Sequence, residues 1–156
     1  MWAVEVFLIR HAAAVDETLD RRDPFRHLTP AGREQARSLG DRLRWHDCNP
    51  THIWTSPLVR AVQTAELVAA GLQSATGVDV LPALAPDESA RAVLAALQAL
   101  PPAAHVVLVG HEPGLSGIAA VLLGTEIPAL AKAEAVRIID GQLRWRFAWN
   151  AEAPDR

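Results

Sequence analysis

The chain has 156 residues, of which half are hydrophobic and 21% are charged, as is typical of one globular domain with a single core. Its formal net charge of -3 gives no reason to expect binding to nucleic acid or to an anionic membrane surface. One cysteine excludes an intramolecular disulfide, and no spacing of Cys and His predicts a metal site. No apolar run approaches the roughly 18 residues of a membrane span. We therefore expect a single cytoplasmic domain over residues 1–156.

The first predicted element is an apolar run that ends in two cationic residues. Residues 2–9 predict a buried strand, and Arg10 and His11 follow at its carboxyl end. In open α/β sheets, ligands bind outside the carboxyl ends of the strands, so chemistry is expected here. The polar stretch 12–28 then predicts a long loop, which is either functional or simply a solvated charged segment.

Two helices are predicted to begin at a hydroxyl residue followed by proline. Thr29-Pro30 begins a helix that ends near Trp45, and Ser56-Pro57 begins a second helix that runs to about Ala70. Arg60 lies on the first turn of the second helix. Because helical side chains point back toward the helix N-terminus, Arg60 should reach toward the top of the sheet.

The remaining elements continue an alternation of strands and helices. We expect strands at 52–55, 78–81 and 105–109, helices at 89–100 and 115–123, and two final strands at 135–139 and 143–149. The nearly continuous apolar run 105–109 is typical of a central parallel strand, and Gly110-His111 follows it. Asp140-Gly141 predicts a tight turn between the last two strands. The order predicts an α/β fold, a three-layer α/β/α sandwich with a mostly parallel central sheet and a C-terminal antiparallel strand pair.

Cationic side chains occur at three of the predicted junctions between a strand and a helix. They are Arg10 with His11, Arg60, and His111. Together with the helix N-termini, these groups make a site for a tetrahedral dianion, and phosphate is the obvious ligand because arginine binds it bidentately. Neighbouring cations also lower the pKa of a histidine, which keeps an imidazole neutral and nucleophilic near neutral pH.

Four motifs occur in a fixed order and span most of the chain. They are Leu8-Ile9-Arg10-His11-Ala12, Leu28-Thr29-Pro30-Ala31-Gly32, the segment SPLVRAVQTA at 56–65, and Val109-Gly110-His111-Glu112-Pro113-Gly114. In these motifs the sequence resembles the histidine phosphatase superfamily, and in particular its small phosphohistidine phosphatase branch of the SixA type. Ala12 stands where the family usually has glycine.

The resemblance implies a fold and a set of roles. The fold would be phosphoglycerate mutase-like with no cap domain, because only residues 82–104 lie where larger relatives insert a cap. His11 would be the nucleophile that carries a phosphohistidine intermediate, and Arg10, Arg60 and His111 would bind the phosphoryl oxygens. No metal or organic cofactor is expected. The open pocket suits a bulky phosphorylated protein.

Several assignments stay open from the sequence. The proton donor is Asp87, Glu88 or Glu112, or else these carboxylates cap helix N-termini. Lys132 either adds positive charge near the site or is a solvated loop residue. The expected function is a cofactor-independent phosphatase acting on a phosphorylated histidine-containing protein, as in phosphorelay signalling. The alternatives are a phosphatase for small phosphomonoesters and a phosphoprotein-binding module without catalysis.

Overall fold

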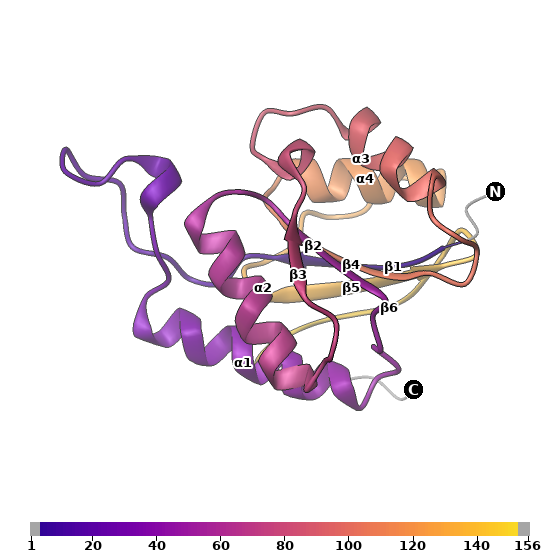
Figure 1. The fold of residues 1–156 in the computed structure, drawn as a ribbon, viewed down its shortest axis with the longest axis horizontal. Helices are drawn as coiled ribbons and strands as arrows, with labels where there is room; N and C mark the ends of the chain where they lie inside the picture. The colour runs from indigo at the N-terminus through magenta and orange to yellow at the C-terminus, as the bar shows by residue number, and fades with distance from the viewer. Residues whose placement is uncertain (1–3, 153–156) are drawn as a thin grey trace.

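The computed structural model describes residues 4–152 and contains an alternation of strands and helices (Figure 1). The elements are β1 (Glu5–Arg10), η1 (Asp23–Phe25), α1 (Pro30–Arg44), β2 (His52–Thr55), α2 (Val59–Leu72), β3 (Val78–Val80), η2 (Pro82–Leu84), α3 (Ala90–Gln98), β4 (His105–Gly110), α4 (Gly114–Leu123), β5 (Glu134–Ile139) and β6 (Gln142–Ala148). The first two residues of the predicted N-terminal strand, 2 and 3, lie outside the described residues. The predicted order of strands and helices is confirmed.

One sheet of six strands, in the order β3-β2-β4-β1-β5-β6, forms the middle layer. β1, β2, β3 and β4 pair in parallel, whereas β5 is antiparallel to both β1 and β6. Helices α1 and α2 lie on one face and α3 and α4 on the other (Figure 1). Asp140 and Gly141 both have positive φ, as a tight hairpin turn between β5 and β6 requires. The predicted α/β/α sandwich with its antiparallel C-terminal pair is confirmed.

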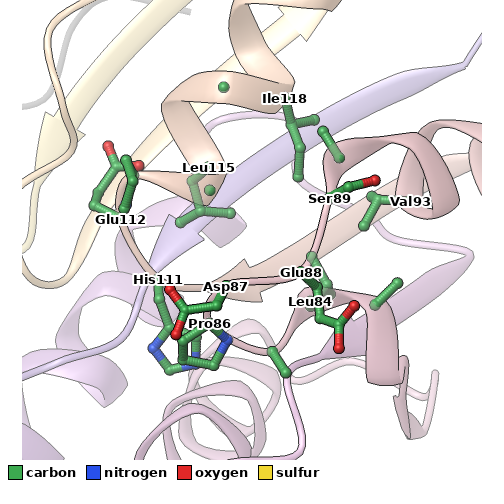
Figure 2. Close-up of a pocket in the computed structure, with 16 residues that line it drawn as sticks. Leu84, Pro86, Asp87, Glu88, Ser89, Val93, His111, Glu112, Leu115 and Ile118 are labelled. Atoms are coloured by element: carbon green, nitrogen blue, oxygen red, sulfur yellow. The ribbon is translucent and has the colours of Figure 1, made fainter.

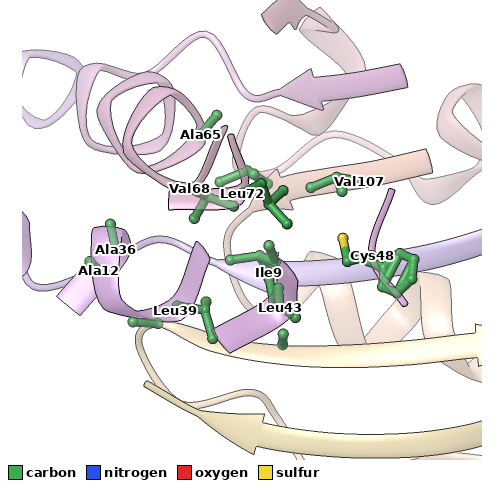
Figure 3. Close-up of a cluster of buried hydrophobic side chains, with 14 of the residues drawn as sticks. Ile9, Ala12, Ala36, Leu39, Leu43, Cys48, Ala65, Val68, Leu72 and Val107 are labelled. Carbon is green, nitrogen blue, oxygen red and sulfur yellow. The ribbon is translucent and has the colours of Figure 1, made fainter. Parts of the chain in front are cut away.

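Two apolar clusters hold the three layers together, one on each face of the sheet. In β1, Phe7 and Ile9 belong to the cluster beneath α1 and α2, whereas Val6 and Leu8 belong to the cluster beneath α3 and α4. Figure 3 shows part of the first cluster, in which Ile9 lies among side chains from both helices. Because both faces of the strand are covered, it reads as a continuous apolar run in the sequence.

Helices α1 and α2 approach each other so closely that two glycines are required at the contact. A Cβ on Gly40 would overlap the carbonyl oxygen of Val68, and a Cβ on Gly71 would overlap that of Arg37. The backbones therefore touch directly where the helices cross. This contact fixes the position of α2, which carries Arg60 at its beginning.

Three features of the fold bear on the predicted site. Helix α2 begins at Val59, so the prediction that it starts at Ser56-Pro57 is wrong by about three residues. Between β3 and β4 the chain forms only η2 and α3, so no cap covers the carboxyl ends of the strands. Within residues 4–152, no helix has the length and apolar character needed to cross a membrane.

Candidate active site

The sheet order brings three predicted junctions together. β4 lies between β1 and β2, and Arg10 at the end of β1 is in register with Gly110 at the end of β4. The His11 amide donates to the Gly110 carbonyl at 3.1 Å, so the two histidines follow adjacent strand ends. Their ring centroids are 5.2 Å apart. The junctions meet because parallel neighbours end at the same edge of the sheet.

Arg10, His11, Arg60 and His111, the four residues predicted to bind phosphate, line one cavity of about 260 Å³. The other residues lining this cationic cavity are Asp23, Arg26, Pro86, Glu112 and Lys132. Its lining carries more cationic side chains, Arg10, Arg26, Arg60 and Lys132, than carboxylates, Asp23 and Glu112, although the net charge of the chain is negative. The cavity therefore suits an anion of the size of phosphate.

The ring of His11 is held in one tautomer. Nδ1 lies 2.8 Å from the carbonyl oxygen of Ala12, and because a carbonyl only accepts, Nδ1 carries the proton. Nε2 is then the nitrogen with the free lone pair. Burial is the main cause that lowers the pKa of His11; the Ala12 hydrogen bond opposes it, the charges of Arg60, Arg10 and Lys132 add to it, and the pKa falls to about 4. The imidazole is neutral at pH 7.

Ala12 fits without backbone strain in the place of the glycine that the family usually has. Its φ is not in the left-handed region, and its methyl group is buried in the cluster beneath α1 and α2. Its amide donates to Oγ1 of Thr64 at 3.0 Å, and the Thr64 hydroxyl donates to the Arg60 carbonyl at 2.8 Å. Thr64 therefore joins the nucleophile segment to the first turn of α2.

Arg60 reaches the cavity from the first turn of α2, as its place in the sequence predicts. Its guanidinium donates to the Asp23 carbonyl at 3.0 Å and lies 3.4 Å from the Asp23 carboxylate. Although burial raises the pKa of Asp23, hydrogen bonds from Arg26 and Arg60 and their charges outweigh this and hold it below its usual value. In this structure Asp23 thus occupies part of the guanidinium surface that an anionic ligand would use.

His111 is oriented by a serine that the sequence predicted as a helix cap. Because α2 begins at Val59, Ser56 is free to turn inward, and its fully buried Oγ lies 2.7 Å from Nε2 of His111. Among the described residues, Nδ1 of His111 is buried and has no hydrogen-bond partner. Burial and the nearby His11 and Arg60 lower the pKa of His111 to about 3. This ring is also neutral at pH 7.

The three candidate proton donors differ in their surroundings. Both carboxylate oxygens of Glu112 accept backbone hydrogen bonds, from the amides of Ser116 at 2.8 Å and Leu130 at 2.6 Å, which supports the capping alternative. The side chain that caps α3 is Ser89, so Asp87 and Glu88 do not cap it. Asp87 has a φ of 67°, and Figure 2 shows its carboxylate at the His111 end of a second cavity.

Three residues reach the cationic cavity through contacts between distant parts of the chain: Asp23, Arg26 and Lys132. Asp23 and Arg26 belong to the loop 12–28. The length of this loop was consistent with a functional segment but did not indicate which of its residues would line a site. Lys132 is exposed but lines the cavity, because the Ala133 amide next to it donates to the Arg10 carbonyl at 3.1 Å. In residues 4–152 no group of three or more His, Cys, Asp or Glu side chains could hold a metal ion.

The fold is that of the family that the motifs indicated. The model of the histidine phosphatase superfamily (branch 1) matches residues 6–85, so the chain belongs to this family and is a hydrolase.

Two sequences and one solved structure illustrate the relationship. An uncharacterized protein of Picosynechococcus is 38% identical over 114 residues, which cover 72% of this chain and 68% of that protein. Phosphohistidine phosphatase SixA of Escherichia coli is 29% identical over 154 residues, which cover 93% and 94% of the two chains. The structure of the protein histidine phosphatase SixA complexed with tungstate has a TM-score of 0.85 and 27% identity, covering 93% of this chain and 97% of the other.

Proposed function

We propose that this protein is a phosphohistidine phosphatase that acts through a covalent phosphohistidine intermediate on His11. The observation that carries the proposal is the tautomer of His11: its Nδ1 proton is bound to the Ala12 carbonyl, so a neutral Nε2 is available as nucleophile beside a cationic cavity. The likeness to Escherichia coli SixA over nearly the whole chain supports phosphohistidine as the substrate.

The reaction would proceed in two displacements. Nε2 of His11 attacks phosphorus and the P–N bond of the substrate phosphohistidine breaks, so that the substrate imidazole leaves with the electron pair and is protonated. Water then attacks phosphorus and breaks the new P–N bond, which releases inorganic phosphate and restores neutral His11. Arg10, Arg60 and the free nitrogen of His111 would stabilise the phosphoryl oxygens in both steps.

The leaving group also favours phosphohistidine over a phosphate ester. An alkoxide needs a proton from a strong general acid, whereas an imidazole is a far better leaving group and its nitrogen can arrive protonated. Glu112 is engaged by two backbone amides, and Asp87 and Glu88 line the second cavity without lining the cationic one. We assign no obligatory acid, so hydrolysis of a stable phosphate monoester should be much slower than that of phosphohistidine.

The test uses a phosphorylated histidine-containing protein with the native chain and its His11→Asn variant. Native protein should release phosphate and, on rapid quenching, carry a base-stable, acid-labile phosphoryl label, whereas His11→Asn should do neither. Release by the variant at the native rate would overturn the nucleophile. Hydrolysis of a stable alkyl phosphate monoester, such as glycerol phosphate, as fast as of phosphohistidine would favour the phosphomonoester alternative. Binding of vanadate without turnover would favour the binding module.

A further inference from the structure

A second cavity of about 280 Å³ adjoins the cationic cavity on the side of His111. We call it the apolar cavity. One wall consists of residues 83–90 with Val93, and the other of residues 111–115, 117 and 118 (Figure 2). His111, Glu112 and Pro86 line both cavities, so the two are adjacent. None of the proposed steps at phosphorus uses this space.

The inner surface of the apolar cavity is made of side chains that a hydrocarbon group would contact. Leu84, Val93, Leu115 and Ile118 line it, and each is buried in the cluster beneath α3 and α4. On α4, Gly117 leaves the wall bare, since within residues 4–152 a Cβ there would meet no atom closer than 4 Å. Gly117 is itself exposed, so a larger side chain at this position would border the opening of the apolar cavity.

The charges around the apolar cavity restrict its occupant. Its lining includes three carboxylates, those of Asp87, Glu88 and Glu112, and no Lys or Arg side chain. A second phosphate, or another anionic part of a small metabolite, would therefore be repelled. The volume lies just below the range of roughly 300–1000 Å³ typical of small-molecule sites, which fits one large side chain. Because Leu84, Val93, Leu115 and Ile118 form an aliphatic inner surface that offers no partner to a charged group, an uncharged apolar side chain matches the cavity best.

The position of the apolar cavity relates it to the leaving group. The cationic cavity is lined by Arg10, His11 and Arg60, and none of these three lines the apolar cavity. The apolar cavity therefore lies on the side of His111 that faces away from the nucleophile. The attacking and leaving groups of phosphoryl transfer lie roughly in line, which directs the substrate away from His11. We propose that the apolar cavity binds one large apolar side chain of the phosphoprotein, a neighbour of its phosphohistidine, and so selects the substrate. This inference rests on the proposed function.

The test compares phosphohistidine peptides in which a single leucine is moved through the positions flanking the phosphohistidine in an alanine background. Inorganic phosphoramidate, which has a P–N bond and no side chain, serves as the minimal substrate. The filling variant is Gly117→Leu, which replaces a helix-unfavourable glycine at a position where the added Cβ meets no atom within 4 Å. Its control is Val121→Leu, a half-exposed position of α4 outside the apolar cavity.

For native protein, leucine at one flanking position should raise kcat/KM at least tenfold over alanine, the effect expected from burying such a side chain. Gly117→Leu should abolish this preference and leave phosphoramidate hydrolysis unchanged, whereas Val121→Leu should retain both. Equal rates on all peptides, an unaltered preference in Gly117→Leu, or equal losses on peptides and phosphoramidate would each overturn the assignment. Native protein inactive on every P–N substrate would instead refute the proposed function.

Discussion

Thr64 offers a sharp test of how the nucleophile is held, because one buried hydroxyl serves two partners. In Thr64→Val the shape of the side chain is kept but the Ala12 amide loses its acceptor. The Arg60 carbonyl is less affected, since it also lies within α2 as a helix acceptor. An unpaired buried N–H costs about 1–3 kcal/mol, so the free energy of unfolding should fall by about 2 kcal/mol. In a domain of this size that lowers Tm by roughly 4–8 °C.

The same substitution should also reduce catalysis, because the Ala12 peptide orients the His11 ring through its carbonyl. We expect kcat for phosphohistidine to fall by roughly tenfold to a hundredfold, with little change in KM, since misplacing a nucleophile affects the reaction more than binding. Thr64→Ser is the matched control: it keeps the hydroxyl and should stay within about threefold of native kcat. Thermal unfolding and steady-state kinetics measure both effects. If Thr64→Val melts and turns over like Thr64→Ser, the hydrogen bond does not hold the nucleophile.

Three further predictions concern charge in the cationic cavity. Arg60→Ala should weaken vanadate binding by about 1.5–3 kcal/mol, or roughly tenfold to a hundredfold in Kd by titration calorimetry; an unchanged Kd would exclude Arg60 as a ligand. Asp23→Asn should tighten phosphate binding up to about fivefold, because the partly exposed carboxylate competes for Arg60; weaker binding would contradict that competition. Folding lowers the pKa of His11 from 6.5 to about 4 and that of His111 from 6.5 to about 3. At a pH between 6.5 and about 4, the unfolded chain therefore binds more protons than the folded chain. The free energy of unfolding should therefore fall as pH decreases from about 6.5 toward 4 in urea titrations. The fall should be smaller in His11→Asn, and an equal fall in that variant would contradict the assignment.

The meeting of Arg10, His11, Arg60 and His111 could be predicted because it follows from local rules. Each residue comes at or just after the end of a strand, or on the first turn of a helix. Parallel β1, β2 and β4 are adjacent, so their carboxyl ends coincide. The structure places all four residues in the lining of one cavity, while their chemical roles stay predictions.

Two features of the site could not be predicted from the sequence. One depends on a small shift in where a helix begins, and the other on pairing between distant segments. The Ser-Pro pair at 56–57 has the signature of a helix start, yet α2 begins at Val59 and Ser56 contacts His111 instead. No local pattern indicates that choice, because it is decided by a partner 55 residues away. Lys132 likewise lines the cationic cavity because the chain entering β5 runs beside the end of β1, a pairing that its own loop does not encode.

Because of the glycine contact between α1 and α2, the parts of the chain that line the cationic cavity differ in how freely they can change. With Gly40 and Gly71 against backbone atoms, α2 cannot slide along α1 without a steric clash, so the Arg60 side of the site is fixed. The loops 12–28 and 81–89 supply other parts of the lining, Asp23, Arg26 and Pro86, and loops tolerate sequence change far better than a helix crossing does. Under the proposed function, a change of phosphorylated partner would therefore be accommodated through these loops, while the helix crossing keeps Arg60 in place.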